Sequence, residues 1–438
     1  MASTTSNGPP QPDDTSIFKI FLATDIHLGY GEKDPHRCND SFKAFEEVFK
    51  LARENNADMV LLGGDLFHEN KPSRRCIHFA TDILRRYCMG DRPISFQVIG
   101  DPRPAFFPEP ATQTIPQTAA SSSTSNKQSA PSKRPVSRMW TSLSITPRPP
   151  ADGSQNEPSI LSQMKSESED SHAINFCDPN LNISYPVFSI HGNHDDPIGR
   201  DMLCALDVLQ ASGLVNYFGK QRSLEHIDIY PILLRKGETT LALYGLGAIR
   251  DERLHKLFLA NRVTFYQPDD VQADGLFNMF VIHQNRVARA GTSYIPQSFL
   301  PNFLDLVVWG HEHDPHTEPE HFEDRNFYVL QPGSTVATSL TEEEQGPKFV
   351  GMLSIFKKQF KFKRIELRST RQFLFRHVQL SATDLKPGEL NTTRKVQDFL
   401  IQEIDKLVER AGANYTVPNS FSRFYCCFVF ALTCGIFI

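Results

Sequence analysis

The chain has 438 residues, a length that allows two or three domains. Hydrophobic residues make up 39% of it and charged residues 22%, a composition that excludes a fully disordered chain. The formal net charge of -5 excludes a histone-like polycation, so binding to nucleic acid would have to use local cationic patches or bound metal. The eight cysteines include no Cys-x-x-Cys pair, which argues against a zinc finger and fits reduced thiols in the cytosol or nucleus.

Strands and helices are predicted to alternate along the N-terminal part. Ile17 to Thr24 and Met59 to Leu62 are short apolar runs, typical of buried strands. Apolar residues at helical spacing predict a helix after each strand: Phe42, Phe45, Phe49 and Ala52 in the first, and Ile77, Ala80, Leu84 and Cys88 in the second. Residues 1–16 are polar and proline-rich, so we expect a disordered N-terminus.

Residues 101–172 break from this pattern. These 72 residues contain 11 of the 30 prolines and 15 serines, with few aliphatic side chains. Such a segment cannot bury enough apolar surface to offset the entropy of ordering it. We therefore predict a disordered insertion in a surface loop.

The alternation resumes beyond the insertion. Val187 to Ile190, Phe280 to Ile282 and Leu304 to Trp309 are predicted strands, and a helix is predicted to begin at Met202. Strands that alternate with helices favour an α/β fold with a mostly parallel central sheet.

The C-terminal part carries a basic run that alternates in part with phenylalanines. Its members are Lys357, Lys358, Lys361, Lys363, Arg364, Arg368 and Arg371, with Phe356, Phe360 and Phe362. Period-two alternation predicts a half-buried strand with a cationic outer face, which either contacts nucleic-acid phosphates or is only solvated. An amphipathic stripe follows from Val396 to Val408 and predicts a helix that packs on a small neighbouring domain.

The last segment, 413–438, is an apolar tail. Its final fifteen residues, from Phe424, are nearly all apolar but fall short of the ~20 that span a bilayer. We interpret the tail as the product of an alternative or misread terminal exon rather than as a tail anchor, and we expect no association with membranes.

Five predicted strands end in residue types that bind metal ions. The donors are Asp25 and His27, Asp65, Asn193 with His194, His283, and His311 with His313. In α/β proteins, sites lie beyond the carboxyl ends of the strands, so these side chains should converge on one edge. One such motif alone is weak evidence, but five in order leave little room for coincidence.

The donor set defines the expected chemistry. Two aspartates, one asparagine and four histidines, with His194 left over, are too many for one ion and include no thiolate. Shared between two ions, they suit Mn²⁺, Fe or Zn²⁺. Asp65 is the natural bridge, because a carboxylate offers two oxygens and Gly63-Gly64 allows close approach of the backbone. Such an ion pair clamps a phosphate and activates a water for in-line attack.

These motifs resemble a known superfamily. Asp25-x-His27, Gly63-Gly64-Asp65, Gly192-Asn193-His194-Asp195, His283 and Gly310-His311-Glu312-His313 look like those of the calcineurin-like metallophosphoesterases. The longer strings Thr24–Tyr30, Leu62–Pro72, Ser189–Pro197 and Val281–Arg286 closely resemble the eukaryotic double-strand-break repair nucleases of the meiotic-recombination-eleven family. The resemblance covers about residues 17–410 apart from the insertion.

The resemblance implies a four-layer fold, with two central mixed sheets flanked by helices and a partial α+β capping domain. It places the nuclease domain at 17–371 and the start of the capping domain at 372–412. It implies two Mn²⁺ per chain, one held by Asp25, His27, Asp65 and His313, the other by Asp65, Asn193, His283 and His311.

The resemblance also implies roles for residues that do not bind metal. His194 would contact the scissile phosphate and protonate the leaving oxygen, a proton transfer that suits an imidazole at neutral pH. His68 would position DNA, or would only hydrogen-bond to a metal ligand. Asp195 and Asp196 would orient His194 or cap the following helix.

For the whole protein, the resemblance implies a Mn²⁺-dependent 3′→5′ exonuclease on duplex ends and an endonuclease on single strands. Such a nuclease acts in the nucleus, in double-strand-break repair, recombination, meiosis and telomere maintenance. Its expected partners are double- and single-stranded DNA, a second copy of the chain, a coiled-coil SMC-like ATPase and nibrin. The homodimer would use helices at 74–89 and 201–212, with Leu84, Leu203, Leu206 and Leu209 in the seam, unless these leucines pack on the chain's own sheet.

Two departures from the family bear on partners. The proline-rich insertion falls in the loop that latches onto nibrin, and the chain stops at Ile438, before the helices that bind the ATPase, as in a C-terminally truncated form. Two other functions stay open. One is a phosphatase of the same fold, although Gly64-Asp65-Leu66-Phe67-His68-Glu69 differs from the Gly-Asp-x-Val-Asp-Arg-Gly of Ser/Thr phosphatases. The other is a catalytically weak isoform that interferes as a dimer subunit.

Overall fold

The computed structural model describes residues 14–106, 173–221, 223–268, 275–288, 291–316, 318–342, 344–371, 373–386, 388, 390–414 and 428–433. Most of the predicted insertion lies outside these ranges. Its first six residues are folded, however, because the short helix α3 (Arg103–Phe106) buries Ala105 and Phe106. The predicted boundary at Asp101 is therefore too early. The predicted N-terminal disorder likewise extends too far, since Ser16 is buried and its carbonyl accepts a hydrogen bond from Thr239.

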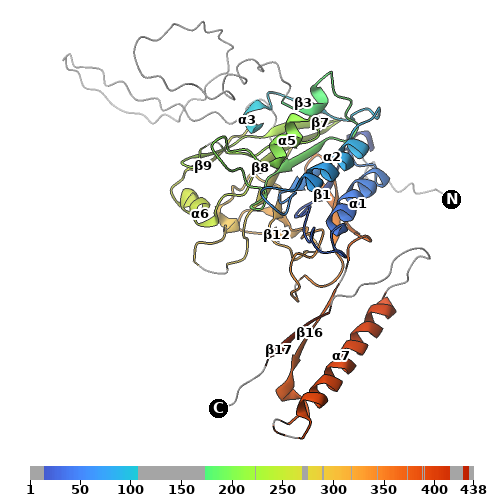
Figure 1. The fold of residues 1–438 in the computed structure, drawn as a ribbon. Coiled ribbons are helices and arrows are strands. Elements are labelled where there is room, and N and C mark those ends of the chain that lie inside the picture. The colour runs from blue at the N-terminus through green and yellow to red at the C-terminus, as the bar shows by residue number, and fades with distance from the viewer. Residues whose placement is uncertain are drawn as a thin grey trace, which may run out of the picture. The chain divides into compact units, whose positions relative to one another are not determined.

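The predicted helices and strands are present (Figure 1), but they alternate only in part: within the described residues, 216–246 and 306–366 each contain successive strands with no α-helix between them. The elements of the first part are β1 (Phe18–Ala23), α1 (Asp40–Glu54), β2 (Met59–Gly63), α2 (Arg74–Cys88), β3 (Gln97–Ile99), β4 (Val187–Ile190), α5 (Ala205–Ala211), β5 (Asn216–Tyr217), β6 (Ile227–Ile229), β7 (Ile232–Lys236) and β8 (Thr239–Leu246). They continue with α6 (Asp251–Leu259), β9 (Val263–Phe265), β10 (Leu276–His283), β11 (Leu306–Gly310), β12 (Glu320–Phe322), β13 (Phe327–Leu330), β14 (Phe349–Phe356) and β15 (Gln359–Glu366).

Two mixed sheets, rather than one, organise the described residues. The first has the order β15-β14-β1-β2-β4-β5, and the second has the order β12-β13-β11-β10-β8-β7-β3. Each has a parallel part, β1-β2-β4-β5 in the first and β8-β10-β11-β13 in the second. Antiparallel strands flank this part on one side in the first sheet and on both sides in the second. The single parallel sheet predicted from the alternation is thus corrected, whereas the α/β class and the pair of mixed sheets are confirmed.

Burial on both faces explains why the central strands read as continuous apolar runs. In β1, Ile20 and Leu22 point into a core shared with β10 and β11 of the other sheet, whereas Phe21 and Ala23 point into a core shared with α1 and α2. A third core lies between the second sheet and α6. The layers therefore run helices, sheet, sheet, helix, and both sheets present the carboxyl ends of parallel strands.

The helix predicted from Met202 begins three residues later, at Ala205. Ile198 and Leu203 pair their backbones in a tight turn, and Met202 within it has a left-handed φ of 50°. The Asp207 carboxylate then accepts a hydrogen bond from the Cys204 N–H and fixes the start of α5. The hydrogen bonds that close this turn therefore delay the start of the helix beyond the point that the spacing of apolar residues predicts.

The leucines predicted to form a dimer seam divide between two environments. Leu84, Leu206 and Leu209 are at most 1% exposed and belong to the core beneath α1, α2 and α5. That part of the prediction is wrong: these side chains pack on the chain's own sheet. Leu203 is 41% exposed and lies near other exposed apolar side chains, Ile198, Met202 and Val208.

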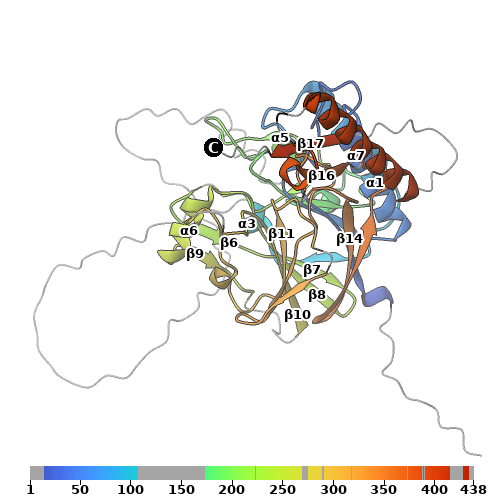
Figure 2. The same cartoon turned by 90° about the horizontal axis from the view of Figure 1, so that it is seen from below.

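The C-terminal residues form a pair of strands, β16 (Leu374–Gln379) and β17 (Phe428–Thr433), with the helix α7 (Thr392–Asn414) between them in the chain. β17 pairs in parallel with β16, so six residues of the predicted tail belong to this unit. α7 runs alongside both strands (Figure 2), with Leu407 buried and Arg376 of β16 paired with Glu403. The Phe375 N–H also donates to Oε1 of Gln345 at 3.2 Å. Among the described residues, no helix combines the length and apolar character that crossing a bilayer requires.

Replacing Leu206 by Ala should destabilise the chain by about 2–5 kcal/mol, because it opens a cavity in the core under α5. Leu203→Ala, at an exposed position in the preceding turn, should change the free energy of unfolding by about 0.5 kcal/mol or less. Chemical denaturation of the two variants and the wild type measures both. Equal, small effects would mean that Leu206 is not a core residue.

Candidate metal centre

The backbone is strained at the predicted metal ligands. Asp25, His27, Asp65 and His311 all have left-handed φ angles, of 52°, 51°, 49° and 84°. Non-glycine residues rarely adopt this conformation, which costs about 1–3 kcal/mol each and persists only where the surroundings enforce it. Here the loops after β1 and β2 bond to each other, the Asp25 N–H to the Gly64 carbonyl and the His27 N–H to the Asp65 carbonyl. The strain therefore points to a functional constraint at these residues.

The first group of converging donors consists of Asp25, His27 and His313. Their donor atoms lie within 4.8 Å of one another. Nε2 of His27 is 3.1 Å from Nε2 of His313, and Nε2 of His313 is 3.6 Å from Oδ1 of Asp25. That Oδ1 atom is buried and has no hydrogen-bond partner among the described residues. A buried carboxylate oxygen without a partner is costly, so a cation between these atoms would complete the group.

The second group consists of Asp65, His283 and His311, joined by Asn193. Nε2 of His283 lies 3.3 Å from Oδ2 of Asp65 and 3.2 Å from Oδ1 of Asn193. Nδ1 of His311 is 2.8 Å from the same Asn193 oxygen. Oδ2 of Asp65 is also 3.7 Å from Nε2 of His27 in the first group. Asp65 therefore faces both groups, in the position that a bridging ligand needs.

Hydrogen bonds on the outer side fix which nitrogen of each imidazole faces inward. Nδ1 of His283 lies 2.8 Å from the carbonyl of Gly63, which only accepts, so this nitrogen carries the proton. In His311, Nε2 bonds to Oδ1 of Asn285 at 3.0 Å. The opposite nitrogens, Nε2 of His283 and Nδ1 of His311, face the donor group, where a bound metal would take the place of a proton. The residues therefore fit two divalent cations bound by oxygen and nitrogen.

The electrostatics of the site favour positive charge. Burial lowers the pKa of His27 to about 3 and keeps the ring neutral. Burial alone would raise the pKa of Asp25, but His283 and His313 outweigh it and bring this pKa down to about 2. Conversely, Asp65 outweighs the effect of burial on His283 and raises its pKa to about 10. Two ionised carboxylates are thus balanced by protons on imidazoles, which a bound cation would displace.

Glycines let the loops approach closely enough. A Cβ on Gly192 would lie 2.0 Å from Oδ1 of Asp65, and one on Gly310 would lie 2.3 Å from the Gly63 carbonyl. A side chain at either position would therefore keep the loops apart.

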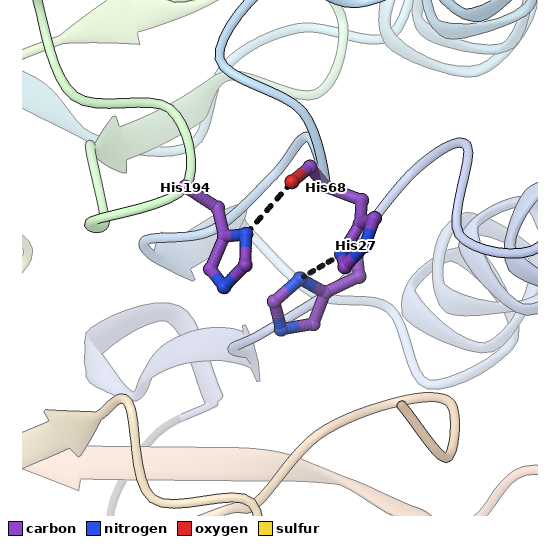
Figure 3. Close-up of side chains that lie close together, drawn as sticks. All are labelled: His27, His68 and His194. Atoms are coloured by element: carbon purple, nitrogen blue, oxygen red, sulfur yellow. Dashed lines mark hydrogen bonds between the residues drawn. The ribbon is translucent and has the colours of Figure 1, made fainter. Parts of the chain in front are cut away.

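His194 and His68 lie beside the first group (Figure 3). Nδ1 of His194 is 2.7 Å from the backbone carbonyl of His68, so this nitrogen is the donor and Nε2 is free for proton transfer. Nδ1 of His68 lies 3.4 Å from Nδ1 of His27. The rings of His68 and His194 stack with centroids 5.0 Å apart. His68 thus supports a candidate ligand and also holds His194, which fits the hydrogen-bonding alternative.

A family model for calcineurin-like phosphoesterases matches residues 18–98 and 163–315, which together exceed half of the chain. The chain belongs to the calcineurin-like phosphoesterase family. A second family model, for the Mre11 DNA-binding presumed domain, matches residues 360–421 of this phosphoesterase.

Curated relatives of the phosphoesterase are double-strand break repair proteins. It is 42% identical over 406 residues to the double-strand break repair protein MRE11 of Rattus norvegicus, covering 92% of this chain and 49% of that protein. It is 42% identical over 401 residues to MRE11 of Homo sapiens, covering 91% of this chain and 48% of that protein. It is 36% identical over 412 residues to the double-strand break repair protein mus-23 of Neurospora crassa, covering 93% of this chain and 47% of that protein. The phosphoesterase thus spans about half the length of these relatives, and the resemblance inferred from its motifs is confirmed.

Asp195 and Asp196 do not have the positions predicted for them. The buried Asp195 carboxylate accepts hydrogen bonds from the backbone N–H groups of Gly192, Leu66 and Phe67. It therefore ties the loop after β4 to the loop after β2, and it neither orients His194 nor caps α5. The Asp196 side chain lies 3.6 Å from Nε2 of His191.

Sequence reasoning missed Asn285, Thr338 and Glu344, whose side chains contact the outer nitrogens of His311 and His313. Asn285 lies in the string Val281–Arg286 used for the resemblance, but no motif marks Thr338 and Glu344. Only a fold that returns this loop to His313 reveals them.

Replacing Gly192 by Ala should displace the Asp65 carboxylate, because the added methyl would overlap Oδ1. We expect Mn²⁺ binding to weaken about tenfold or more, the usual scale for disturbing a ligand's support. Calorimetric titration of the purified chain with Mn²⁺ measures this. Gly275→Ala is the matched control, since nothing lies within 4 Å of its Cβ. Unchanged Mn²⁺ affinity in Gly192→Ala would contradict the geometry given for Asp65.

Proposed function

We propose that this protein is a Mn²⁺-dependent DNA nuclease that hydrolyses phosphodiester bonds with two metal ions. The observation that carries the proposal is the meeting of donors from five strand ends in two groups that share Asp65, with His194 beside them. The membership in the phosphoesterase family supports hydrolysis of a phosphate ester. The similarity to double-strand break repair proteins and the match to a DNA-binding domain support DNA as the substrate.

Asp25, His27, Asp65 and His313 would hold one Mn²⁺, and Asp65, Asn193, His283 and His311 the other. When bound, two such cations polarise a phosphodiester and lower the pKa of a water. His194 would give the proton on Nε2 to the leaving oxygen, while its Nδ1–H stays on the His68 carbonyl. This fixed hydrogen bond keeps the imidazole in one tautomer and one orientation. His68 would therefore act on DNA cleavage through His194 and His27.

The biological setting follows the relatives. We propose 3′→5′ exonuclease activity on duplex ends and endonuclease activity on single strands, in double-strand-break repair, recombination, meiosis and telomere maintenance in the nucleus. A second copy of the chain is the proposed protein partner. The resemblance further implies a coiled-coil SMC-like ATPase and nibrin, whose binding the two departures from the family put in question. The exposed apolar side chains Ile198, Met202, Leu203 and Val208 would supply the dimer contact in place of the buried leucines.

The basic run on β15 supports a DNA contact, and its cations differ in their surroundings. Lys357 pairs with Glu238, Lys358 with Asp305, and Arg371 with Asp40. Lys361 and Lys363 are exposed, and the described residues offer no ion partner to either. Phe360 and Phe362 on the same strand pack against the core between the sheets. The two lysines are thus available to DNA phosphates, as are Arg364, which lies over the Phe349 ring, and Arg368, both of which are also exposed.

The nuclease proposal is tested with 3′-labelled and 5′-labelled duplexes incubated with the purified chain and Mn²⁺ or Mg²⁺. We expect cleavage in Mn²⁺ that is lost in Asp65→Asn, which removes the shared charge, and falls about 10²–10⁴-fold in His194→Leu, which removes the acid. Cleavage that persists unchanged in Asp65→Asn would contradict the proposed site. Activity on a phosphoserine peptide but none on DNA would favour a phosphatase.

Replacing both Lys361 and Lys363 by Ala should weaken duplex binding and lower the slope of log K against log salt by about 1 for each lost phosphate contact. Fluorescence anisotropy over a salt series measures both quantities. Lys358→Ala is the control, because its ammonium already pairs with Asp305. An unchanged slope in the double variant would mean that the strand face is only solvated.

A further inference from the structure

The loop that follows β13 buries two opposite charges close to the candidate metal centre. Glu344 is 6% exposed and Lys348 only 2% exposed. Nζ of Lys348 lies 3.4 Å from Oε2 of Glu344 and donates to Oγ of Ser334 at 2.9 Å. Burying two ions is expensive and is often no gain in stability over apolar side chains. This pair therefore calls for an explanation other than stability.

Glu344 is held rigidly. Its Oε2 accepts a hydrogen bond from the Thr338 N–H, and its Oε1 accepts one from the Ser339 N–H, both at 3.0 Å. With the Lys348 ammonium, these donors fix the carboxylate at the centre of its own loop. Oε1 also lies 3.3 Å from Nδ1 of His313.

The contact with His313 falls on the nitrogen that faces away from the metal centre. Nδ1 of His313 lies 3.3 Å from Oε1 of Glu344 and 2.8 Å from Oγ1 of Thr338, whose hydroxyl is 3.4 Å from the same Oε1. An acceptor set of this kind keeps the proton on Nδ1. The lone pair of Nε2 then faces His27 and Asp25, as a ligand of the first metal requires.

The second metal group has a different support. Its His311 is held through Nε2 by the Asn285 amide, which in turn donates to the Asp251 carboxylate. The group around His311 is thus supported directly by a neutral amide, and the group around His313 by an ionised carboxylate. A carboxylate on the outer nitrogen makes an imidazole a stronger ligand than an amide does.

We propose that Glu344, held in place by Lys348, is a positioning residue for the first metal ion, which it serves by fixing the tautomer and direction of His313. The inference rests on the two-metal site of the proposed function. It assigns to the Glu344–Lys348 pair an effect on one of the two ions alone.

The test measures Mn²⁺ binding to the full chain in two ways: by calorimetric titration, and by the electron paramagnetic resonance signal of coupled Mn²⁺ pairs. Glu344→Gln should weaken one Mn²⁺-binding step about 10–100-fold and leave the other unchanged. The signal of coupled Mn²⁺ pairs should then appear only at a higher Mn²⁺ concentration. Glu342→Gln is the matched control, because it makes the same charge change at an exposed position of the same loop.

A second variant separates positioning from folding, since Glu344→Gln leaves Lys348 buried without its counter-charge. Glu344→Gln combined with Lys348→Met removes both charges, and thermal unfolding without metal checks its fold. We expect the folded double variant to keep the weakened step. Wild-type affinity for both ions in this variant would overturn the inference while leaving the nuclease proposal intact. A wild-type chain that binds no pair of Mn²⁺ would instead overturn the proposed function itself.

Discussion

The Asp65 carboxylate must stay ionised although it is only 1% exposed, and the site is arranged around this requirement. Oδ1 accepts the His194 N–H at 2.8 Å, and Oδ2 faces His283 and His27. A charge so poorly hydrated is tolerated only when opposite charge or donors surround it. The left-handed backbone at Asp65 and the missing side chain at Gly192 both serve to bring the carboxylate to this point. Both donor groups would lose their common member without it.

The sheets matter because they deliver these donors from distant parts of the chain. β1, β2 and β4 end on the first sheet, and β10 and β11 end on the second, so the groups form only where the two sheets pack face to face. The N-terminal strand β1 is covered at its edge by β14, which comes more than three hundred residues later. The metal centre is thus a property of the finished fold and of no shorter segment.

The strand ends and most candidate metal ligands could be predicted from sequence, because both are marked by residues that are close together in the chain. Asp25, Asp65, Asn193, His283 and His311 each follow a short apolar run, so strand ends and chemistry could be read together. Burial of a particular helix face could not: Leu206 and Leu203 are both leucines near the start of α5, and only the tight turn at Met202 decides which one enters the core. The apolar pattern did not reveal the number of sheets, because β1 and β10 have the same apolar character whichever sheet they join. Only the family resemblance predicted two sheets.

Supporting residues escaped prediction for a related reason. Glu344 is one of three consecutive glutamates in a polar loop, a pattern typical of a solvated turn, and its burial depends on the loop folding back onto His313. Asp195, by contrast, was noticed beside His194, but neighbours in sequence suggested the wrong contact. Its partners are the backbone of the loop after β2, more than a hundred residues earlier.

The hydrogen bond from the Phe375 N–H to Gln345 links the C-terminal strand pair to the loop that supports His313. Gln345 follows Glu344 directly, so one short stretch of backbone is attached at one end to the first strand of the C-terminal unit and at the other to an imidazole of the metal centre. Two adjacent loop residues thus join the C-terminal strand pair to the imidazole that the first donor group needs.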